Sequence, residues 1–170
     1  MRNGNKDENC ISKEPFSERR ELLTKPFRKE VKKTIVKTLV WSTLLYGSET
    51  WTLRKEDIRR LEAVEMWMWK RMEKVSWMDK ITNEEILNKV GEKRQLISVI
   101  RNRQKNWIGH VLRGEGLLRE VMEGRMEGKR SRDRPRKGML DELLVESYDN
   151  MKRKAENRDE WRNWMPWTCR

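Results

Sequence analysis

The 170 residues predict an all-α fold: a small helical bundle, then a basic Gly/Arg-rich loop, then a C-terminal helix. Apolar side chains recur at helical spacing through several long stretches, whereas no strand-like alternation persists. Only four residues are proline, so few positions interrupt these helices. Hydrophobic residues make up 35% of the chain, but nine Trp and ten Met supply bulk for a modest core.

The net charge of +12 is concentrated in three segments. Residues 25–51, 93–113 and 125–137 carry net charges of +4, +6 and +5. Concentration of this kind is typical of a site for a polyanion, although a solvated basic face without a partner is the plain alternative. The pattern divides the chain into a polar N-terminal segment (1–24), a helical bundle (25–113), the basic loop (114–138) and a C-terminal helix with a Trp-rich tail (139–170).

The first helix is expected from about Pro26 to Leu45, because proline suits a first helical turn and Gly47 follows closely. Its apolar residues mark two faces, which predicts that its second half is buried on both sides. The faces are Val31, Ile35 and Leu39, and Val36, Val40 and Leu44. Between them Lys29, Lys33 and Lys37 form a row at intervals of four residues.

A second helix is expected from about Thr52 to Val75. Glu65 falls within its apolar side, where an unpaired charge is costly, so its carboxylate should meet a cation or a donor, most simply an arginine. The run from Met66 to Trp69 is interpreted as core packing rather than as a surface for a partner.

A short helix is predicted to begin at Thr82, which forms a capping box with Glu85, and to end at Gly91. Ile81 and Ile86 are placed to form a hydrophobic staple across its first turn.

A third long helix is expected from about Glu92 to Leu112. Its core side holds Leu96, Ile100, Trp107 and Val111. Arg94, Arg101 and Lys105 face the opposite way and are expected on the surface. After the loop, a last helix over about 139–158 turns Leu140, Leu143, Leu144 and Met151 inward, and the tryptophans of the tail are expected to dock on the body.

Metal and nucleophile chemistry are both disfavoured by the residue inventory. Zinc needs about four Cys or His ligands, and the chain has only Cys10, His110 and Cys169. His110 has no paired nucleophile nearby in sequence, and no Gly-rich phosphate loop occurs. No apolar run is long enough to cross a bilayer, so no membrane partner is expected. The two distant cysteines favour a reduced intracellular compartment, nucleus or cytoplasm.

Six segments follow one another in an order that resembles the C-terminal region of reverse transcriptases from non-LTR (LINE-type) retrotransposons. They are LLYGSETWTL, RRLEAVEMWMWKRM, SWMDKITNEEIL, RQLISVIRNRQKNWIGHVLR, GKRSRDRPRKGMLDEL and MKRKAENRDEWRNW. The resemblance covers about residues 16–170 and rests on the ordered set rather than on any single motif. It implies a thumb-like bundle that grips the template–primer of an RNA-directed DNA polymerase.

The same resemblance implies that this chain is a fragment without the catalytic palm. In the family, an aromatic-x-Asp-Asp signature in the palm binds two Mg²⁺ ions, whereas this chain has no Asp-Asp pair. No catalytic residue, metal site or cofactor is therefore expected here, Mg²⁺ being implied only for the palm, and the chain alone is predicted to be inactive. The fingers and palm of a parent polyprotein are implied as partners. Asp133 replaces the small residue of the family's Arg-Gly-Arg-Pro loop, which weakens insertion of the loop into a groove.

Together these patterns predict sequence-independent phosphate contacts to RNA or an RNA–DNA hybrid. The predicted contacts are Lys29, Lys33, Lys37, Arg94, Arg101, Lys105, Arg130, Arg132, Arg134 and Arg136. Residues 129–137 also fit a nuclear import signal. The alternative function is a helical protein-interaction module, or a decayed retroelement remnant without a nucleic-acid role; a small nuclease would need clustered acids, which the spacing does not offer.

Overall fold

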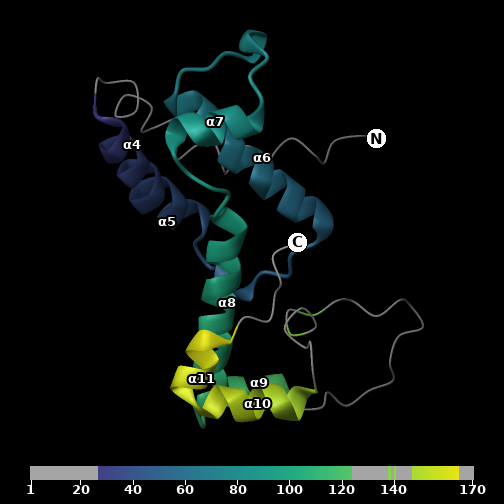
Figure 1. The fold of residues 1–170 in the computed structure, drawn as a ribbon. Helices are drawn as coiled ribbons and strands as arrows, with labels where there is room; N and C mark the ends of the chain where they lie inside the picture. The colour runs from purple at the N-terminus through teal and green to yellow at the C-terminus, as the bar shows by residue number, and fades with distance from the viewer. Residues whose placement is uncertain (1–26, 124–137, 139, 141–146, 165–170) are drawn as a thin grey trace, which may run out of the picture. The chain divides into compact units, whose positions relative to one another are not determined.

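The computed structural model describes residues 27–123, 138, 140 and 147–164, and every regular element within them is helical (Figure 1). The prediction of an all-α fold is confirmed. The elements are α4 (Lys29–Ile35), the π-helical segment η1 (Val36–Val40), α5 (Trp41–Leu44), the 3-10 turn η2 (Ser48–Thr50), α6 (Lys55–Met72), the 3-10 turn η3 (Trp77–Asp79), α7 (Asn83–Val90), α8 (Leu96–Arg113), α9 (Leu117–Glu123), α10 (Tyr148–Glu156) and α11 (Arg158–Asn163).

The chain divides into two compact units. Unit 1 holds the described residues of 27–46 and 54–98, and unit 2 holds 47–53 and the described residues from 99 onward. The boundary therefore falls within α8, whose first three residues belong to unit 1. The sequence instead places one bundle over 25–113, because a continuous helix gives no signal of such a division.

Two tryptophans form the centre of unit 1. Trp41 of α5 and Trp69 of α6 are 5% and 0% exposed, and their rings meet edge to face with centroids 6.2 Å apart. An aromatic pair of this geometry contributes about 1 kcal/mol beyond its buried area. Met66 and Met68 are also buried, and Trp67 is half-buried, so the interpretation of this run as core packing is confirmed.

The first helix begins at Lys29, three residues after the expected start, and is buried on one side only. Val36, Val40 and Trp41 are all buried, because the wide turn of η1 keeps these three residues on the inner side. Val31 and Leu39 remain 45% and 38% exposed. The prediction that the second half of this helix is buried on both sides is therefore wrong.

The buried carboxylate of Glu65 joins α6 to α8. Its Oε1 atom accepts hydrogen bonds from the backbone N–H groups of Gln95 (2.9 Å) and Leu96 (3.3 Å), donors that would otherwise be unsatisfied at the start of α8. The expected donor is thus backbone rather than an arginine. Burial raises the pKa of Glu65, and the two backbone N–H groups oppose that rise.

Helix α7 follows the sequence prediction closely. The N–H of Glu85 donates to the Thr82 hydroxyl (3.3 Å), and the N–H of Thr82 donates to the Glu85 carboxylate (3.0 Å). Gly91 ends the helix in the left-handed region at φ 70°, and Ile86 is fully buried.

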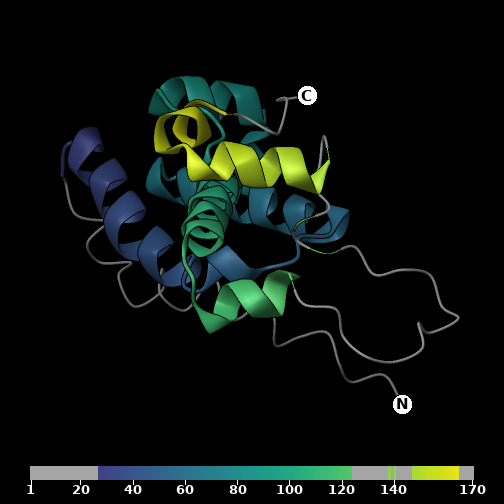
Figure 2. The same ribbon diagram turned by 90° about the horizontal axis from the view of Figure 1, so that it is seen from below.

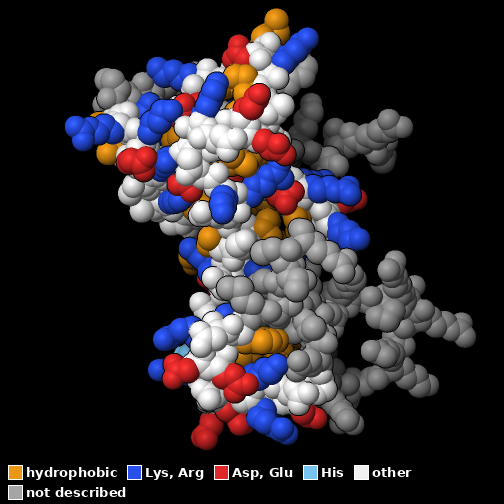
Figure 3. All heavy atoms as spheres, in the orientation of Figure 1, with side chains coloured by type: hydrophobic (Ala, Val, Ile, Leu, Met, Phe, Trp, Pro, Cys, Tyr) orange, Lys and Arg blue, Asp and Glu red, His pale blue; other side chains and the backbone are white. Residues whose placement is uncertain are grey.

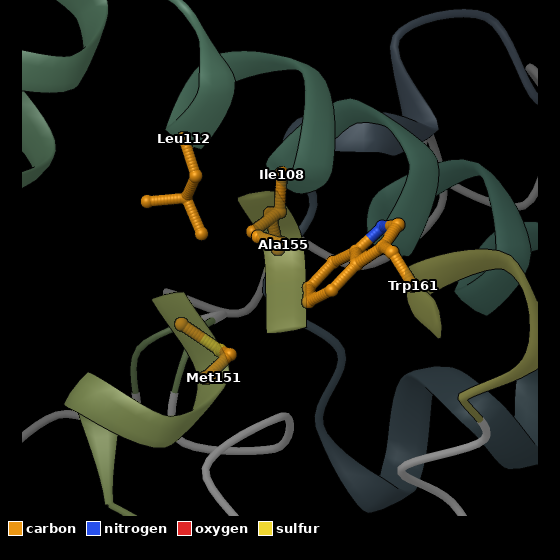
Figure 4. Packing of buried hydrophobic residues seen from close by; sticks show 5 residues of the cluster. All are labelled: Ile108, Leu112, Met151, Ala155 and Trp161. Atoms are coloured by element: carbon orange, nitrogen blue, oxygen red, sulfur yellow. The ribbon is translucent and has the colours of Figure 1, made fainter. Parts of the chain in front are cut away.

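Unit 2 is built on the C-terminal part of α8. Ile108 and Leu112 of α8 pack with Met151 and Ala155 of α10 and with Trp161 of α11 (Figure 4). Figure 2 shows α9 and α10 flanking this end of α8. A Cβ at position 109 would collide with the Trp161 ring, so glycine permits the close approach of α11.

The tail prediction is confirmed for the part that the structure describes. Trp161 is 3% exposed, and Trp164 packs partly buried beside it. The predicted last helix over 139–158 is described from Tyr148 onward, and Leu140 packs against the same core. Leu143 and Leu144 lie outside the described residues.

Candidate nucleic-acid interface

The solvent-facing side of α6 carries four bases. Arg60 and Arg71 lie eleven residues apart, and Arg59 and Lys70 form a neighbouring pair with the same spacing. On an α-helix both pairs fall on one side, with the half-buried Trp67 between them. The three arginines are exposed and Lys70 is half-buried. We name these four residues the α6 basic face; Figure 3 shows many basic side chains, with acidic ones among them, on the visible face of unit 1.

The acids of α6 and its C-cap mostly turn toward other contacts. Asp57 accepts the N–H of Arg54 (3.0 Å), and Glu65 is buried at the start of α8. Glu62 lies 3.7 Å from Arg94, and the C-cap residue Glu73 lies 3.2 Å from Lys29. Glu56, in the first turn, is the exposed exception. The total charge of α6 is small. Because most of its acids are directed away from its bases, the solvent side of the helix has a positive electrostatic potential.

The predicted lysine row on the first helix is paired with carboxylates. The ammonium of Lys37 lies 2.9 Å from Glu92, and Lys29 lies 3.2 Å from Glu73. Lys33, whose side chain is only 11% exposed, lies 3.1 Å from Glu30. Two of these three pairs join α4 and η1 to residues near α6 and α8. The row therefore contributes to the packing of unit 1, and its role in binding nucleic acid stays a prediction that these contacts do not favour.

Lys105 is not on the surface. The side chain is 4% exposed and donates hydrogen bonds to the backbone carbonyls of Arg162 (3.1 Å) and Trp164 (3.0 Å) at the end of α11. Burial lowers the pKa of Lys105. The predicted surface position is wrong because α11 packs over this side of α8, a contact between segments 57 and 59 residues apart.

The other predicted contacts are placed differently. Arg94 lies in unit 1 with its side chain 47% exposed, and Arg101 lies in unit 2, half-buried. Arg130, Arg132, Arg134 and Arg136 lie outside the described residues. The predicted set thus belongs to two units and to the loop, and its role in binding nucleic acid stays a prediction.

No group of three or more His, Cys, Asp or Glu is placed to hold a metal ion within the described ranges. Among the same residues, no helix has both the length and the apolar character needed to cross a bilayer.

Comparisons with known proteins identify no relative. No family model matches the chain, and no curated protein or solved structure matches it. The candidate site therefore rests on the residues themselves.

The α6 basic face is absent from the sequence-based site. Residues 54–90 carry nine bases and eight acids, so their summed charge conceals it. A helical projection of residues 55–72 separates Arg59, Arg60, Lys70 and Arg71 from most of the acids, and this is the signal that could have found it.

Proposed function

We propose that this chain binds nucleic acid through its phosphates, with the α6 basic face as the principal contact. The observation that supports the proposal is the separation of bases from acids on α6. The described residues of unit 1 include sixteen Lys and Arg but only ten Asp and Glu. This excess of bases gives the described part of unit 1 a net positive charge, which attracts a polyanion.

The dimensions of the face suit a phosphate backbone. Eleven residues separate Arg60 from Arg71, a rise of about 16 Å along the helix. Guanidinium groups bind phosphate oxygens through paired donors, and such contacts carry no base specificity. Trp67, between the two arginines, adds an aromatic surface beside them. Binding is therefore independent of sequence and sensitive to salt.

We further propose that the chain corresponds to the thumb-like C-terminal region of a non-LTR reverse transcriptase. The ordered segments quoted above support this, and RRLEAVEMWMWKRM includes all four residues of the α6 basic face. The bound species is then a template–primer duplex, RNA or an RNA–DNA hybrid. Polymerisation requires a palm that these 170 residues do not contain, because no Asp-Asp pair occurs among them.

Fluorescence anisotropy with a labelled RNA–DNA hybrid tests phosphate binding. If about six phosphates are contacted, the logarithm of the affinity falls with the logarithm of the salt concentration with a slope near −5. Replacing Arg60 and Arg71 by alanine should weaken binding about tenfold and reduce the slope by about 2.

The matched control removes two exposed arginines from unit 2, Arg153→Ala with Arg162→Ala, and so makes the same change in net charge. It should leave the affinity within about threefold, since a charge outside the α6 basic face acts only through a screened field. A flat salt response of the unaltered chain, or equal losses in both variants, contradicts the proposal.

A second candidate function is protein interaction, favoured by an apolar stripe on the first helix. Val31 and Leu39 of this helix are 45% and 38% exposed, and Phe27, which precedes the helix, is 42% exposed. The run Met66–Trp69, which could have served this role, is mostly buried. Sedimentation of the purified chain measures whether the stripe mediates self-association, which Val31→Glu would then abolish.

A further inference from the structure

The connection between α6 and α7 holds two lysines in the left-handed region. Lys74 has φ 57° and Lys80 has φ 46°. Lys74 closes α6 in a pattern that usually ends in glycine: the N–H of Val75 donates to Lys70 O (3.0 Å), and the N–H of Lys74 donates to Arg71 O (3.2 Å). A side chain at such a φ is strained relative to glycine.

The segment between these lysines is fixed by its own hydrogen bonds. The N–H of Ser76 donates to the Asp79 carboxylate (2.7 Å), and the N–H of Asp79 donates to Ser76 O (3.2 Å). The N–H of Met78 donates to the Ser76 hydroxyl (3.4 Å). We name residues 74–80 the α6–α7 loop. It is a pre-shaped turn whose backbone does not need a partner to become ordered.

Met78 projects from this loop into solvent. Its 81% exposure is among the highest of the large apolar side chains that the structure describes. A methionine held on a fixed turn presents a polarizable apolar group that can pack on an aromatic partner surface.

The charges around Met78 favour an anionic partner. Lys70, Arg71, Lys74 and Lys80 lie within or beside the loop. The two acids of the same stretch are engaged, Glu73 with Lys29 and Asp79 with the Ser76 N–H. Glycine would relieve the backbone at both left-handed positions, yet each position carries a lysine. Strained backbone positions often belong to functional sites. We therefore infer that the ammonium groups of Lys74 and Lys80 have a function, namely contact with an anion.

We propose that the α6–α7 loop recognises a break in a nucleic-acid duplex, where Met78 packs on the uncovered face of a base. A continuous duplex offers only phosphates to such a loop, whereas an end or a gap offers an apolar base face with phosphates around it. Lys74 and Lys80 bind those flanking phosphates. Methionine packs well on aromatic rings, and apolar wedges of this kind occupy unstacked base steps. The proposal rests on the proposed function, because Lys70 and Arg71 of the α6 basic face adjoin the loop.

Two RNA–DNA hybrid probes test it with the full chain. One is a dumbbell closed at both ends, and the other is the same dumbbell with a short single-stranded gap. The unaltered chain should bind the gapped probe about tenfold more tightly, the effect of one stacked base. Met78→Ala should bind both probes equally, whereas Val31→Ala, which shortens an exposed apolar side chain on α4, should keep the preference.

Glycine at the left-handed positions gives a second readout. Lys74→Gly and Lys80→Gly should raise the melting temperature and weaken binding to the gapped probe about threefold each, because strain and charge are removed together. A purely structural role for the lysines would change the melting temperature and leave affinity unaltered, which contradicts the proposal.

The remaining outcomes separate this inference from the proposed function. Binding to both probes without a preference, or a preference that Met78→Ala retains, overturns the role of the loop and leaves phosphate binding by α6 intact. Failure to bind either probe overturns both. Vesicles of phosphatidylserine and phosphatidylcholine are the last probe. If Met78→Ala abolishes binding to the vesicles but does not change binding to the gapped probe, the loop binds a membrane surface and the proposal is overturned.

Discussion

The first helix and α6 both present bases at helical spacing, but the two rows have different surroundings. Lys29, Lys33 and Lys37 each lie within 3.2 Å of a carboxylate, and two of those carboxylates come from other elements. On α6 most of the carboxylates are directed to other contacts, with the exposed Glu56 as the exception, and the α6 basic face lies on the solvent side of the helix. A basic row in sequence thus stabilises the fold where acids of other elements pair with it, and it is a candidate binding surface where it lies on the solvent side of its helix.

The largest expected effect concerns an acid of α6. Glu65→Ala removes the acceptor of two N–H groups at the start of α8 and leaves a cavity, so the free energy of unfolding should fall by about 3 kcal/mol. Arg59→Ala on the exposed side of the same helix should change it by less than about 0.5 kcal/mol. Urea unfolding followed by circular dichroism measures both. If the two variants lose similar amounts of unfolding free energy, then the buried acid and the exposed base of α6 do not differ in their contribution to stability, as the account requires them to.

Charge reversal compares the two rows directly. Lys37→Glu places a carboxylate beside Glu92, whose side chain is only 12% exposed, and should lower the free energy of unfolding by about 2 kcal/mol. Arg71→Glu makes the same charge change on α6 and should leave stability within about 0.5 kcal/mol while weakening hybrid binding about tenfold. Urea unfolding and fluorescence anisotropy measure the stability and the hybrid affinity of both variants. A loss of stability in Arg71→Glu together with a loss of affinity in Lys37→Glu would contradict the comparison.

Neutralising the lysine row should affect binding little. Lys29→Ala with Lys37→Ala should lower affinity for an RNA–DNA hybrid less than about threefold, because these ammonium groups already have carboxylate partners. The slope of affinity against salt should stay within about 0.5 of the unaltered chain. A reduction of the slope by about 2 would show that both lysines release counterions on binding, and the row would then belong to the interface.

The smallest expected effect is a pH dependence. Burial raises the pKa of Glu65 above its ordinary value of 4.5, so the folded state holds this proton more tightly than the unfolded state. The contribution of Glu65 to stability is therefore greatest below pH 4.5 and declines as the pH rises through the raised pKa. Glu65→Gln lacks this term, so its stability relative to the unaltered chain should improve from pH 4.5 to 7. An opposite trend in urea unfolding would mean that the carboxylate is stabilised in its charged form.

Local patterns predicted the helices well, and contacts between distant segments decided the rest. The capping box of Thr82 and the burial of Trp161 follow from a few neighbouring residues or from simple hydrophobicity. The pairing of Lys37 with Glu92 joins residues 55 positions apart, and the burial of Lys105 depends on carbonyls of α11. Neither contact can be predicted from the residues that neighbour the lysine in the sequence. The α6 basic face was within reach of the sequence, because a helical projection needs only the spacing of residues 55–72.

Lysine acetylation footprinting with and without an RNA–DNA hybrid tests most directly which basic row meets nucleic acid. Lys70 of α6 should lose reactivity when the hybrid is added, while Lys29 and Lys37 should react at the same rate in both samples. Protection of Lys29 and Lys37 with no change at Lys70 would contradict the central claim that the outward side of α6 is the binding surface.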